Sequence, residues 1–413
     1  MLINQKFSSS FVPLQTVQGI DLGKFCNTLN DKILIIWGAG HQGRVLQRAF
    51  EKIGYLKIAF CDSNTSLHNQ TINGKSVFHP QVAIDLAKAK NAVLIIANYQ
   101  NLNTIKLSCE HSGLQEHHDF YTYLKLRRQE AVIEITDSRT KHLMPFSAYQ
   151  NVLDKMLNDI PNLLHIDLNG WGDPLLNPDL PKIVKYTETF ISCTVTTRIP
   201  KNCNIELVLE SKPSQFLFTI SDYDMCLSNL NQDLNWEDIK KILLQVSFQQ
   251  KKTKDTEFRV LLARKRNYNV YQISKLQDLC KDLSLRLIIS NSYPSSYESF
   301  LNDSFIKSSQ SDSSLNSINW DLDLALSLAE KDRHLPCLCQ RIFPIIDAHQ
   351  RVNICHLYQN AILSNEYLLS NYSNLLDQRK DNQHCRLCQS HSLHRLDIDV
   401  LQRRNNINLE LYK

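Results

Sequence analysis

Glycine is scarce in this sequence, with 10 residues among 413. Because so little of it serves as filler, each glycine that remains indicates a backbone requirement such as a tight turn. Long apolar runs are absent too, since no segment approaches the ~18 residues that a transmembrane helix needs. The opening stretch MLINQKFSSSF has one lysine and no apolar core of signal-peptide length. We therefore expect a cytoplasmic protein without a membrane span.

A strong charge of either sign is also missing, because the formal net charge is only +4. The basic runs at 250–254 and 264–266 are short and lack interleaved aromatic residues, which is typical of a solvated surface. We therefore expect no nucleic-acid partner. The hydrophobic fraction of 43% and the charged fraction of 21% are those of globular proteins. At ~100–200 residues per domain, the length predicts two or three domains.

The first motif is a glycine-rich turn between an apolar strand and a helical segment, within residues 32–62. Gly38 permits the turn, Gly40 allows a pyrophosphate to approach the backbone, and Gly43 allows close packing of helix on strand. Asp62 ends the next strand, where an acid accepts from a ribose hydroxyl. This pattern favours a Rossmann-like domain that binds a nucleotide or nucleotide sugar. A structural βαβ unit with an empty crevice is the alternative.

The sequence after Asp62 supports the same interpretation. An acid, a loop, the run Ile72-Asn73-Gly74, then Val77 and Pro80 follow one another. This order resembles the N-terminal nucleotide-sugar-binding domains that are attached to bacterial sugar-modifying enzymes. The resemblance implies a nucleotide-sugar ligand and a role in bacterial surface-polysaccharide metabolism.

From residue 131 the chain alternates strand and helix patterns again, which predicts a parallel sheet with outer helices, either open or curled into a partial (β/α) barrel. Ligands of such sheets bind at the carboxyl ends of the strands. Two segments lie there: the loop DSRTKHLMPF at 137–146, and NGWGDPLLNPDL at 169–180. Glycines and a proline at a strand end also suit any strand-to-helix turn.

Twelve cysteines in a reducing compartment do not indicate disulfides, and seven of them are scattered singly. The other five are clustered near the C-terminus. Cys337 and Cys339 precede an apolar strand, Cys355 ends the strand after the next turn, and Cys385 and Cys388 form a Cys-x-x-Cys. A hairpin with thiols at both ends, together with this pair, predicts four converging thiolates. Such a set binds an iron-sulfur cluster or zinc; unligated thiols are the third alternative.

The middle and last segments together resemble radical S-adenosylmethionine (SAM) enzymes with a C-terminal SPASM or twitch domain. In that family, the loop after the first strand holds three cysteines that bind a 4Fe-4S cluster, and the cluster cleaves SAM reductively. Here that loop, 137–146, has no cysteine. The resemblance therefore implies the fold without reductive SAM cleavage, because no one-electron donor would lie beside SAM.

The second segment resembles the family's G-G-E-P motif, which contacts the amino end of SAM. Gly170, Gly172 and Pro174 match it, and Asp173 replaces the glutamate. The resemblance implies a SAM-type pocket there, while SAM binding itself is left open. At the C-terminus, the order of strand, turn, strand, cysteine and distant Cys-x-x-Cys resembles the twitch domain and implies one auxiliary 4Fe-4S cluster, with Cys339 preferred to Cys337.

The chain is thus predicted to be α/β throughout, with three domains. These are a Rossmann-like domain at 1–125, a radical-SAM-like partial barrel at 129–335 and a cysteine-rich domain at 336–413. The first hypothesis is an iron-sulfur protein that binds a small nucleotide or sugar and performs no radical chemistry. An NAD- or nucleotide-sugar-dependent oxidoreductase and a zinc-stabilised structural or assembly protein are the alternatives. Enzymatic activity, a protein partner and the oligomeric state are left open.

Overall fold

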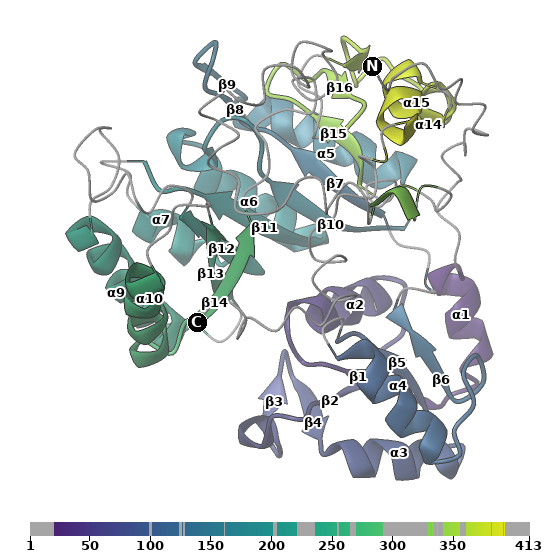
Figure 1. Cartoon of the computed structure of the whole chain (residues 1–413). Coiled ribbons are helices and arrows are strands. Elements are labelled where there is room, and N and C mark those ends of the chain that lie inside the picture. Colours follow the sequence, from purple (N-terminus) through teal and green to yellow (C-terminus); the bar gives the residue numbers. More distant parts are fainter. Residues whose placement is uncertain are drawn as a thin grey trace, which may run out of the picture.

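The computed structural model describes residues 20–98, 101–123, 126, 129–160, 162–200, 205–220, 236–253, 256–264, 270–291, 329–331, 333, 337, 342–355, 361–380, 382–390 and 392. They form two largely parallel sheets with helices packed on them (Figure 1). Within these ranges no helix is long and apolar enough to cross a membrane.

The N-terminal unit is a six-stranded sheet in the order β3-β4-β2-β1-β5-β6. Its strands are β1 (Ile33–Trp37), β2 (Ile58–Cys61), β3 (Thr71–Ile72), β4 (Lys75–Phe78), β5 (Ala92–Ile96) and β6 (Phe120–Thr122). Its helices are α1 (Leu22–Thr28), α2 (His41–Lys52), α3 (Pro80–Lys88) and α4 (Leu102–His111). The chain winds from central β1 to one side and then returns to β5 on the other, which opens a crevice at the carboxyl ends of those two strands.

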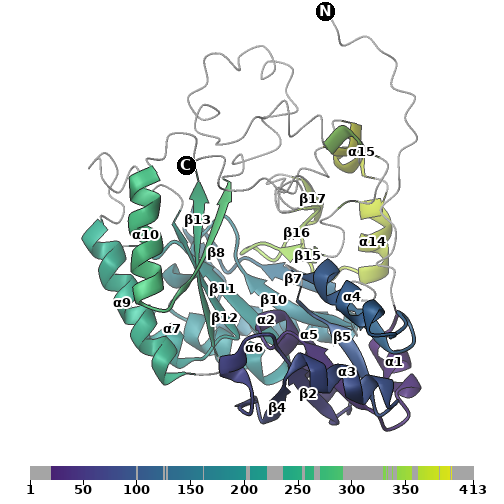
Figure 2. The same ribbon diagram turned by 60° about the horizontal axis from the view of Figure 1, so that its bottom comes forward.

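Helix α2 follows β1 directly and belongs to both units of the molecule. Leu46 and Phe50 recur at helical spacing and are buried against the first sheet. Arg44 and Arg48 reach the second unit, where they form ion pairs with Glu257 and Glu188. The helix lies at the border between the two units (Figures 1 and 2) and contacts strand β10 of the second sheet.

The second unit is a nine-stranded sheet in the order β14-β13-β12-β11-β10-β7-β15-β16-β17. Its strands are β7 (Gln129–Ile133), β10 (Leu163–Leu168), β11 (Ser192–Thr197), β12 (Gln215–Ile220), β13 (Glu257–Arg264), β14 (Arg286–Asn291), β15 (Ile342–Ile346), β16 (Val352–Asn353) and β17 (Ile362–Ser364). From β7 to β14 the six parallel strands lie side by side in chain order. This is the order of a partial (β/α) barrel, and it differs from the doubly wound order of the first sheet.

Helices cover one face of this second sheet (Figure 2). They are α5 (Phe146–Asp159), α6 (Leu180–Phe190), α7 (Ile205–Glu210), α9 (Trp236–Lys252) and α10 (Val270–Asp282). Side chains alternate along a strand, so Ile166, Val195 and Phe216 join the core beneath the helices. Their neighbours His165 and Thr194 face the other side. The inner face of the barrel wall is therefore polar in its amino-terminal half.

The loop after β7 forms a small hairpin of its own, although its sequence predicts only a polar loop. Strands β8 (Thr136–Asp137) and β9 (His142–Leu143) pair antiparallel within it. The preceding strand ends at Ile133, earlier than its apolar pattern predicts, although the backbone N–H of Glu134 still donates to the carbonyl of Ile346 in the neighbouring β15.

The C-terminal segment contributes strands to the second sheet. Strand β15 pairs parallel with β7, and β16 and β17 continue antiparallel beyond it. Helices α14 (Tyr372–Lys380) and α15 (Gln383–Ser390) follow. Phe343 is fully buried in the core of the second unit. The predicted domain limit at 335/336 lies outside the described residues, and the division into separate middle and last domains stays a prediction.

We expect Phe343→Ala to lower the free energy of unfolding by about 3–5 kcal/mol, because a buried aromatic side chain is replaced by a cavity. Urea unfolding of the full chain, followed by circular dichroism, measures the change. Phe248→Ala is the matched control, since Phe248 is 58% exposed on α9 and we expect a loss of at most about 1 kcal/mol there. Equal losses in the two variants would contradict a shared core for β15 and the barrel.

Candidate functional site

The glycine-rich turn has the geometry that its sequence predicts for two of the three glycines. Gly38 has a φ of +116°, which favours glycine. A Cβ on Gly43 would lie 1.9 Å from the carbonyl oxygen of Gly38, so only glycine fits there. Around Gly40 a Cβ would meet nothing within 4 Å, and the residue is exposed. Space is therefore open where the predicted pyrophosphate would approach.

Asp62 lies beside this turn and helps to hold its shape. One carboxylate oxygen accepts from the backbone N–H of Ala39 at 2.9 Å, and the other accepts from that of Asn64 at 2.9 Å. No side chain caps the N-terminus of α2 at Gly40. Helix N–H groups without a cap favour an anion, which suits a phosphate group. Nucleotide binding at Gly38, Gly40, Gly43 and Asp62 stays a prediction.

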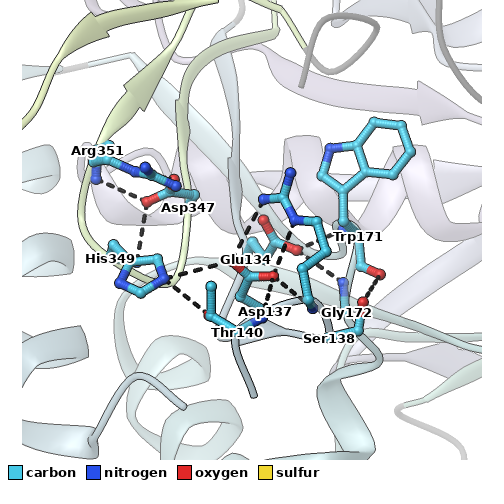
Figure 3. Close-up of polar contacts among 10 residues, drawn as sticks. Glu134, Asp137, Ser138, Thr140, Trp171, Gly172, Asp347, His349 and Arg351 are labelled. Atoms are coloured by element: carbon cyan, nitrogen blue, oxygen red, sulfur yellow. Dashed lines mark hydrogen bonds and ion pairs between the residues drawn. The ribbon is translucent and has the colours of Figure 1, made fainter. Parts of the chain in front are cut away.

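The second candidate site lies at the carboxyl end of β7, around the buried carboxyl of Glu134 (Figure 3). Its Oε1 accepts from the backbone N–H groups of Trp171 at 2.6 Å and of Gly172 at 2.8 Å. These two residues belong to the NGWGDP segment after β10. Glu134 thus joins the carboxyl ends of two neighbouring strands.

The glycines of this segment make room for β7 and the residues after it. A Cβ on Gly170 would lie 2.6 Å from Cγ of Glu134, and one on Gly172 would lie 1.9 Å from the carbonyl oxygen of Thr136. Both positions therefore need glycine for packing alone. Their predicted contact with SAM stays a prediction, and the close approach of the two strand ends already explains their presence.

The carboxylate of Asp173 accepts hydrogen bonds from other residues of the chain. Its carboxylate accepts from Leu175 N, Thr197 Oγ1 and Arg198 N at 2.7–2.9 Å, so it ties the end of β10 to the end of β11. Burial raises its pKa, and these hydrogen bonds act in the opposite direction. Pro174 is buried at the first position of the short 3-10 helix Pro174–Leu176. In this structure both residues fix the strand-to-helix turn.

Asp137 anchors the hairpin that replaces the expected loop. Its carboxylate is 2% exposed and accepts from the backbone N–H of Arg139 at 2.9 Å and from Nε of Arg139 at 3.1 Å. Burial acts to raise the pKa of Asp137, but the hydrogen bonds from Arg139 and Thr140 outweigh it and hold the pKa well below its usual range. The group therefore stays ionised.

The turn between β15 and β16 closes this site from the other side (Figure 3). Nε2 of His349 lies 3.1 Å from Oγ1 of Thr140 and 3.4 Å from Oδ2 of Asp137. Asp347 accepts from His349 N at 3.0 Å and from Nε of Arg351 at 2.6 Å. The ring of His349 also stacks on His142 at 4.3 Å. The cysteine-free loop is thus fastened to the C-terminal hairpin by polar contacts.

Sequence reasoning did not single out Glu134, Asp137, Asp347 or Arg351 as site residues. A signal was present for two of them, because Glu134 and Asp347 come directly after the short apolar strands β7 and β15, where the ends of parallel strands meet. The partners across the sheet could not be identified, since their pairing depends on tertiary contacts between distant segments.

The C-terminal cysteines come from three segments. Cys337 and Cys385 are partly exposed, whereas Cys355 and Cys388 are buried. Burial raises the pKa of the Cys385 thiol to about 12; Arg379 lowers it, and the nearby Cys337 and Cys355 raise it. Within the described ranges no three His, Cys, Asp or Glu side chains have metal-site spacing. Cys339 lies outside those ranges, so the predicted ligand set stays a prediction.

No protein-family model matches the sequence, and no curated protein is detectably similar to it. Among solved structures, SuiB from Streptococcus suis bound to its precursor peptide SuiA aligns at 15% identity and a TM-score of 0.43, over 69% of this chain and 70% of that chain. SuiB bound to S-adenosylmethionine aligns at 13% identity and 0.42, over 69% of each chain. A spore photoproduct lyase mutant with bound AdoMet aligns at 11% identity and 0.26, over 61% and 73%. Because these similarities are weak, the ligands and activities of the aligned proteins cannot be assigned to this chain.

We expect the stability of the protein to depend on pH through Glu134. Burial is the largest of the effects that raise the pKa of Glu134 from 4.5 to about 7. Because the folded pKa is the higher one, ionisation destabilises the fold: the loss begins above pH ~4.5 and is complete above pH ~7. Glu134→Gln keeps an oxygen acceptor for Trp171 and Gly172 and removes this titration.

The unfolding free energy of wild type minus that of Glu134→Gln should therefore fall by roughly 3 kcal/mol between pH 4.5 and pH 8. Urea unfolding at both pH values measures it. Glu366→Gln, an exposed acid after β17, is the control and should leave a difference that hardly changes with pH. A flat difference for Glu134→Gln would show that its carboxyl titrates normally in the folded protein.

Proposed function

We propose that this chain is a radical-SAM-like iron-sulfur protein that does not cleave SAM reductively, with a Rossmann-like module for a nucleotide or nucleotide sugar. The observation that carries this proposal is the hairpin after β7. In the position where the family resemblance expects three cysteines, the buried carboxylate of Asp137 pairs with the exposed Arg139, and His349 closes the hairpin from the C-terminal segment.

The barrel order of the six parallel strands β7 to β14 supports the fold part of the proposal. The polar contacts of the hairpin support the loss of cleavage. A site that binds a reducible cluster needs thiolate ligands on that loop, whereas this loop offers an ionised carboxylate engaged by an arginine. The side chain of Asp173, which replaces the family's glutamate, is likewise already used by Thr197 and Arg198. Of the properties that the family resemblance implies, SAM binding at this edge of the sheet therefore has the least structural support.

The C-terminal cysteines support one auxiliary 4Fe-4S cluster. The described cysteines do not have metal-site spacing in this structure, but Cys337 and Cys355, which come from separate segments, both lie near enough to Cys385 to raise its pKa. Arg379 is only 4% exposed and packs over the ring of Phe343. A buried guanidinium beside thiols suits a group with net negative charge. The proposed ligands are Cys355, Cys385, Cys388 and one of Cys337 and Cys339, with Cys339 preferred. Zinc is the competing metal.

A cluster here would hold the C-terminal hairpin and helix α15 together, since metal binding and folding are coupled in small thiolate sites. The glycine turn with its open space at Gly40 and the uncapped start of α2 support the nucleotide module. We place the protein in the cytoplasm, with a small nucleotide or sugar as its ligand and surface-polysaccharide metabolism as its context.

Anaerobic purification with iron, acid-labile sulfide and zinc counted per chain tests the metal assignment. We expect about four irons and four sulfides, as one cubane cluster requires. Cys385→Ala combined with Cys388→Ala should lose the iron and most soluble protein. Cys109→Ala with Cys280→Ala removes the same number of thiols from buried positions elsewhere, and this control should keep the iron. About one zinc without sulfide would favour the structural alternative and contradict the cluster.

The loss of radical chemistry has a direct test. The purified protein, reconstituted with iron and sulfide, is incubated anaerobically with SAM and dithionite, and 5′-deoxyadenosine is measured by mass spectrometry. We expect none above the level without protein, because the hairpin after β7 offers no thiolate ligand. An active radical SAM enzyme treated in parallel shows that the conditions support cleavage. Formation of 5′-deoxyadenosine, or eight irons per chain, would overturn the proposal.

A further inference from the structure

A cavity of about 270 Å³ lies between helix α2 and the inner face of the barrel wall. Its location differs from both sites described above, because it lies beneath α2 and against the middle of strands β7, β10, β11, β12 and β13 rather than at their carboxyl ends. The ring of Tyr123 and apolar side chains such as Leu46 and Leu217 form part of the lining. The lining therefore combines apolar side chains with several polar groups, which can fix the orientation of a ligand.

The register of the sheet arranges the polar groups of this cavity in rows. Asp167, Thr194 and Gln215 are register partners across β10, β11 and β12. Glu130 is likewise the partner of His165 across β7 and β10. Partners in a parallel sheet project from the same face, so these side chains form a continuous polar surface beneath α2. The outer face of the same strands is apolar core.

Two of these side chains have unused hydrogen-bonding capacity. The Thr194 hydroxyl donates its only proton to Oε1 of Gln215 at 3.2 Å. The same hydroxyl oxygen therefore accepts from Nε2 of His165, which lies 2.9 Å away. The chain of bonds leaves a donor at Nε2 of Gln215 and an acceptor at Nδ1 of His165. Among the described residues neither atom has a partner within hydrogen-bonding geometry, although the backbone of Ser192 lies near enough to His165 to act on its pKa. Both side chains are more than nine-tenths buried. Unsatisfied buried polar atoms are uncommon and call for a partner.

Helix α2 contributes a third such atom. The ring of His41, at the first position of the helix, packs edge-on against His165 with 5.0 Å between ring centres. Its Nδ1 is buried and has no partner among the described residues, and the side chain lines the cavity. Burial lowers the pKa of both histidines, so both rings are neutral at pH 7 and offer one donor or acceptor per nitrogen.

The charges around the cavity decide between an anionic and a neutral ligand. Glu130 and Asp167 bring two carboxylates to the lining. The one lining arginine, Arg259, is engaged by Glu257 at 2.6 Å. A phosphate would therefore meet repulsion here, whereas a ligand with several hydroxyls can donate to the carboxylates and accept from Gln215.

We propose that this cavity binds a single polyhydroxylated ring, a sugar, either free or as the sugar end of a nucleotide sugar. Its hydroxyls bond to Glu130, Asp167, His165 and Gln215, and its apolar face packs on the lining beside Tyr123. The linked form rests on the proposed nucleotide module, since the cavity adjoins the first turn of α2, next to the glycine turn. The size suits one ring and excludes a whole nucleotide sugar, because pockets for drug-sized ligands measure ~300–1,000 Å³.

Isothermal titration with the full-length wild-type protein tests the proposal. The probes are glucose, galactose, mannose and N-acetylglucosamine, then UDP-glucose, UDP-N-acetylglucosamine and GDP-mannose, then UDP and GDP alone. At least one probe with a sugar should bind, and a nucleotide sugar that binds more tightly than its nucleotide identifies the linked source. Binding of monosaccharides alone identifies the free source. If no probe with a sugar binds, or if no monosaccharide binds and sugar-linked and bare nucleotides bind equally, the cavity proposal is wrong.

Two variants locate the binding. Gln215→Leu removes the unused donor, and Thr196→Val removes a hydroxyl that bonds to Asp167 at nearly constant volume. Each should weaken the sugar-containing probe about tenfold, the usual effect of leaving a buried partner unsatisfied. Thr71→Val, at an exposed position of β3, is the matched control and should bind like wild type. Circular dichroism checks folding, and if Gln215→Leu is unfolded, Thr196→Val decides alone. Unchanged affinity in the folded variants would overturn the assignment.

Gly40→Val separates this proposal from the nucleotide module. A branched side chain there fills the open space beside α2 and should abolish binding of UDP and GDP while leaving that of a free monosaccharide. If nucleotides bind wild type and Gly40→Val equally, the nucleotide module is wrong and the cavity is judged by the monosaccharides. If Gly40→Val loses nucleotides but the cavity variants bind every probe like wild type, the module stands and the cavity proposal is wrong.

Discussion

The packing of helix α2 between two sheets is the constraint on which the rest of the molecule depends. Its apolar side completes the core of the first sheet, and its charged side forms ion pairs with the barrel through Arg44 and Arg48. The helix begins at the glycine turn, so any ligand on that turn would lie beside the barrel. A displacement of α2 would therefore change the crevice, the interface and the polar cavity together.

The two ends of the second sheet differ in whether their polar side chains have hydrogen-bond partners. At the carboxyl ends of the strands, Glu134 and Asp173 accept hydrogen bonds from the ends of neighbouring strands, and Asp137 accepts from Arg139 within its own hairpin. At the amino-terminal half, His165 and Gln215 retain capacity that no described residue uses. Partial barrels normally bind ligands at the carboxyl ends. In this chain the unsatisfied groups favour the opposite end, where the N-terminal unit covers the sheet.

Much of the fold was predictable because its signals are local. Short apolar runs predicted β1, β5, β10 and β12, and glycine or proline at the boundaries predicted where helices begin. The chain order of strands also followed from the repeated strand-helix pattern. The hairpin of β8 and β9 was not predicted, because its two-residue strands depend on one buried acid, Asp137, and on a histidine far along the chain.

The candidate sites divide in the same way. The glycine turn was predictable, since Gly38 and Gly43 are required by backbone geometry that the motif encodes. The segment around Gly172 was recognisable as well, yet its glycines are explained by packing against Thr136, which a motif alone cannot distinguish from ligand binding. The polar residues of the cavity alternate with apolar ones along β10 and β11. That alternation was visible in the sequence. It indicates a cavity only when the structure shows that α2 covers the polar face.

The pairing of β15 with β7 has a consequence for the order of events during synthesis. One edge of β7 finds its partner in β10 soon after translation, but the other waits for Ile342–Ile346. At ~5–20 residues per second, roughly ten to forty seconds pass before that strand is made. During this interval an apolar strand edge is available for pairing with other chains. This edge of β7 is covered only when the C-terminal segment has been made.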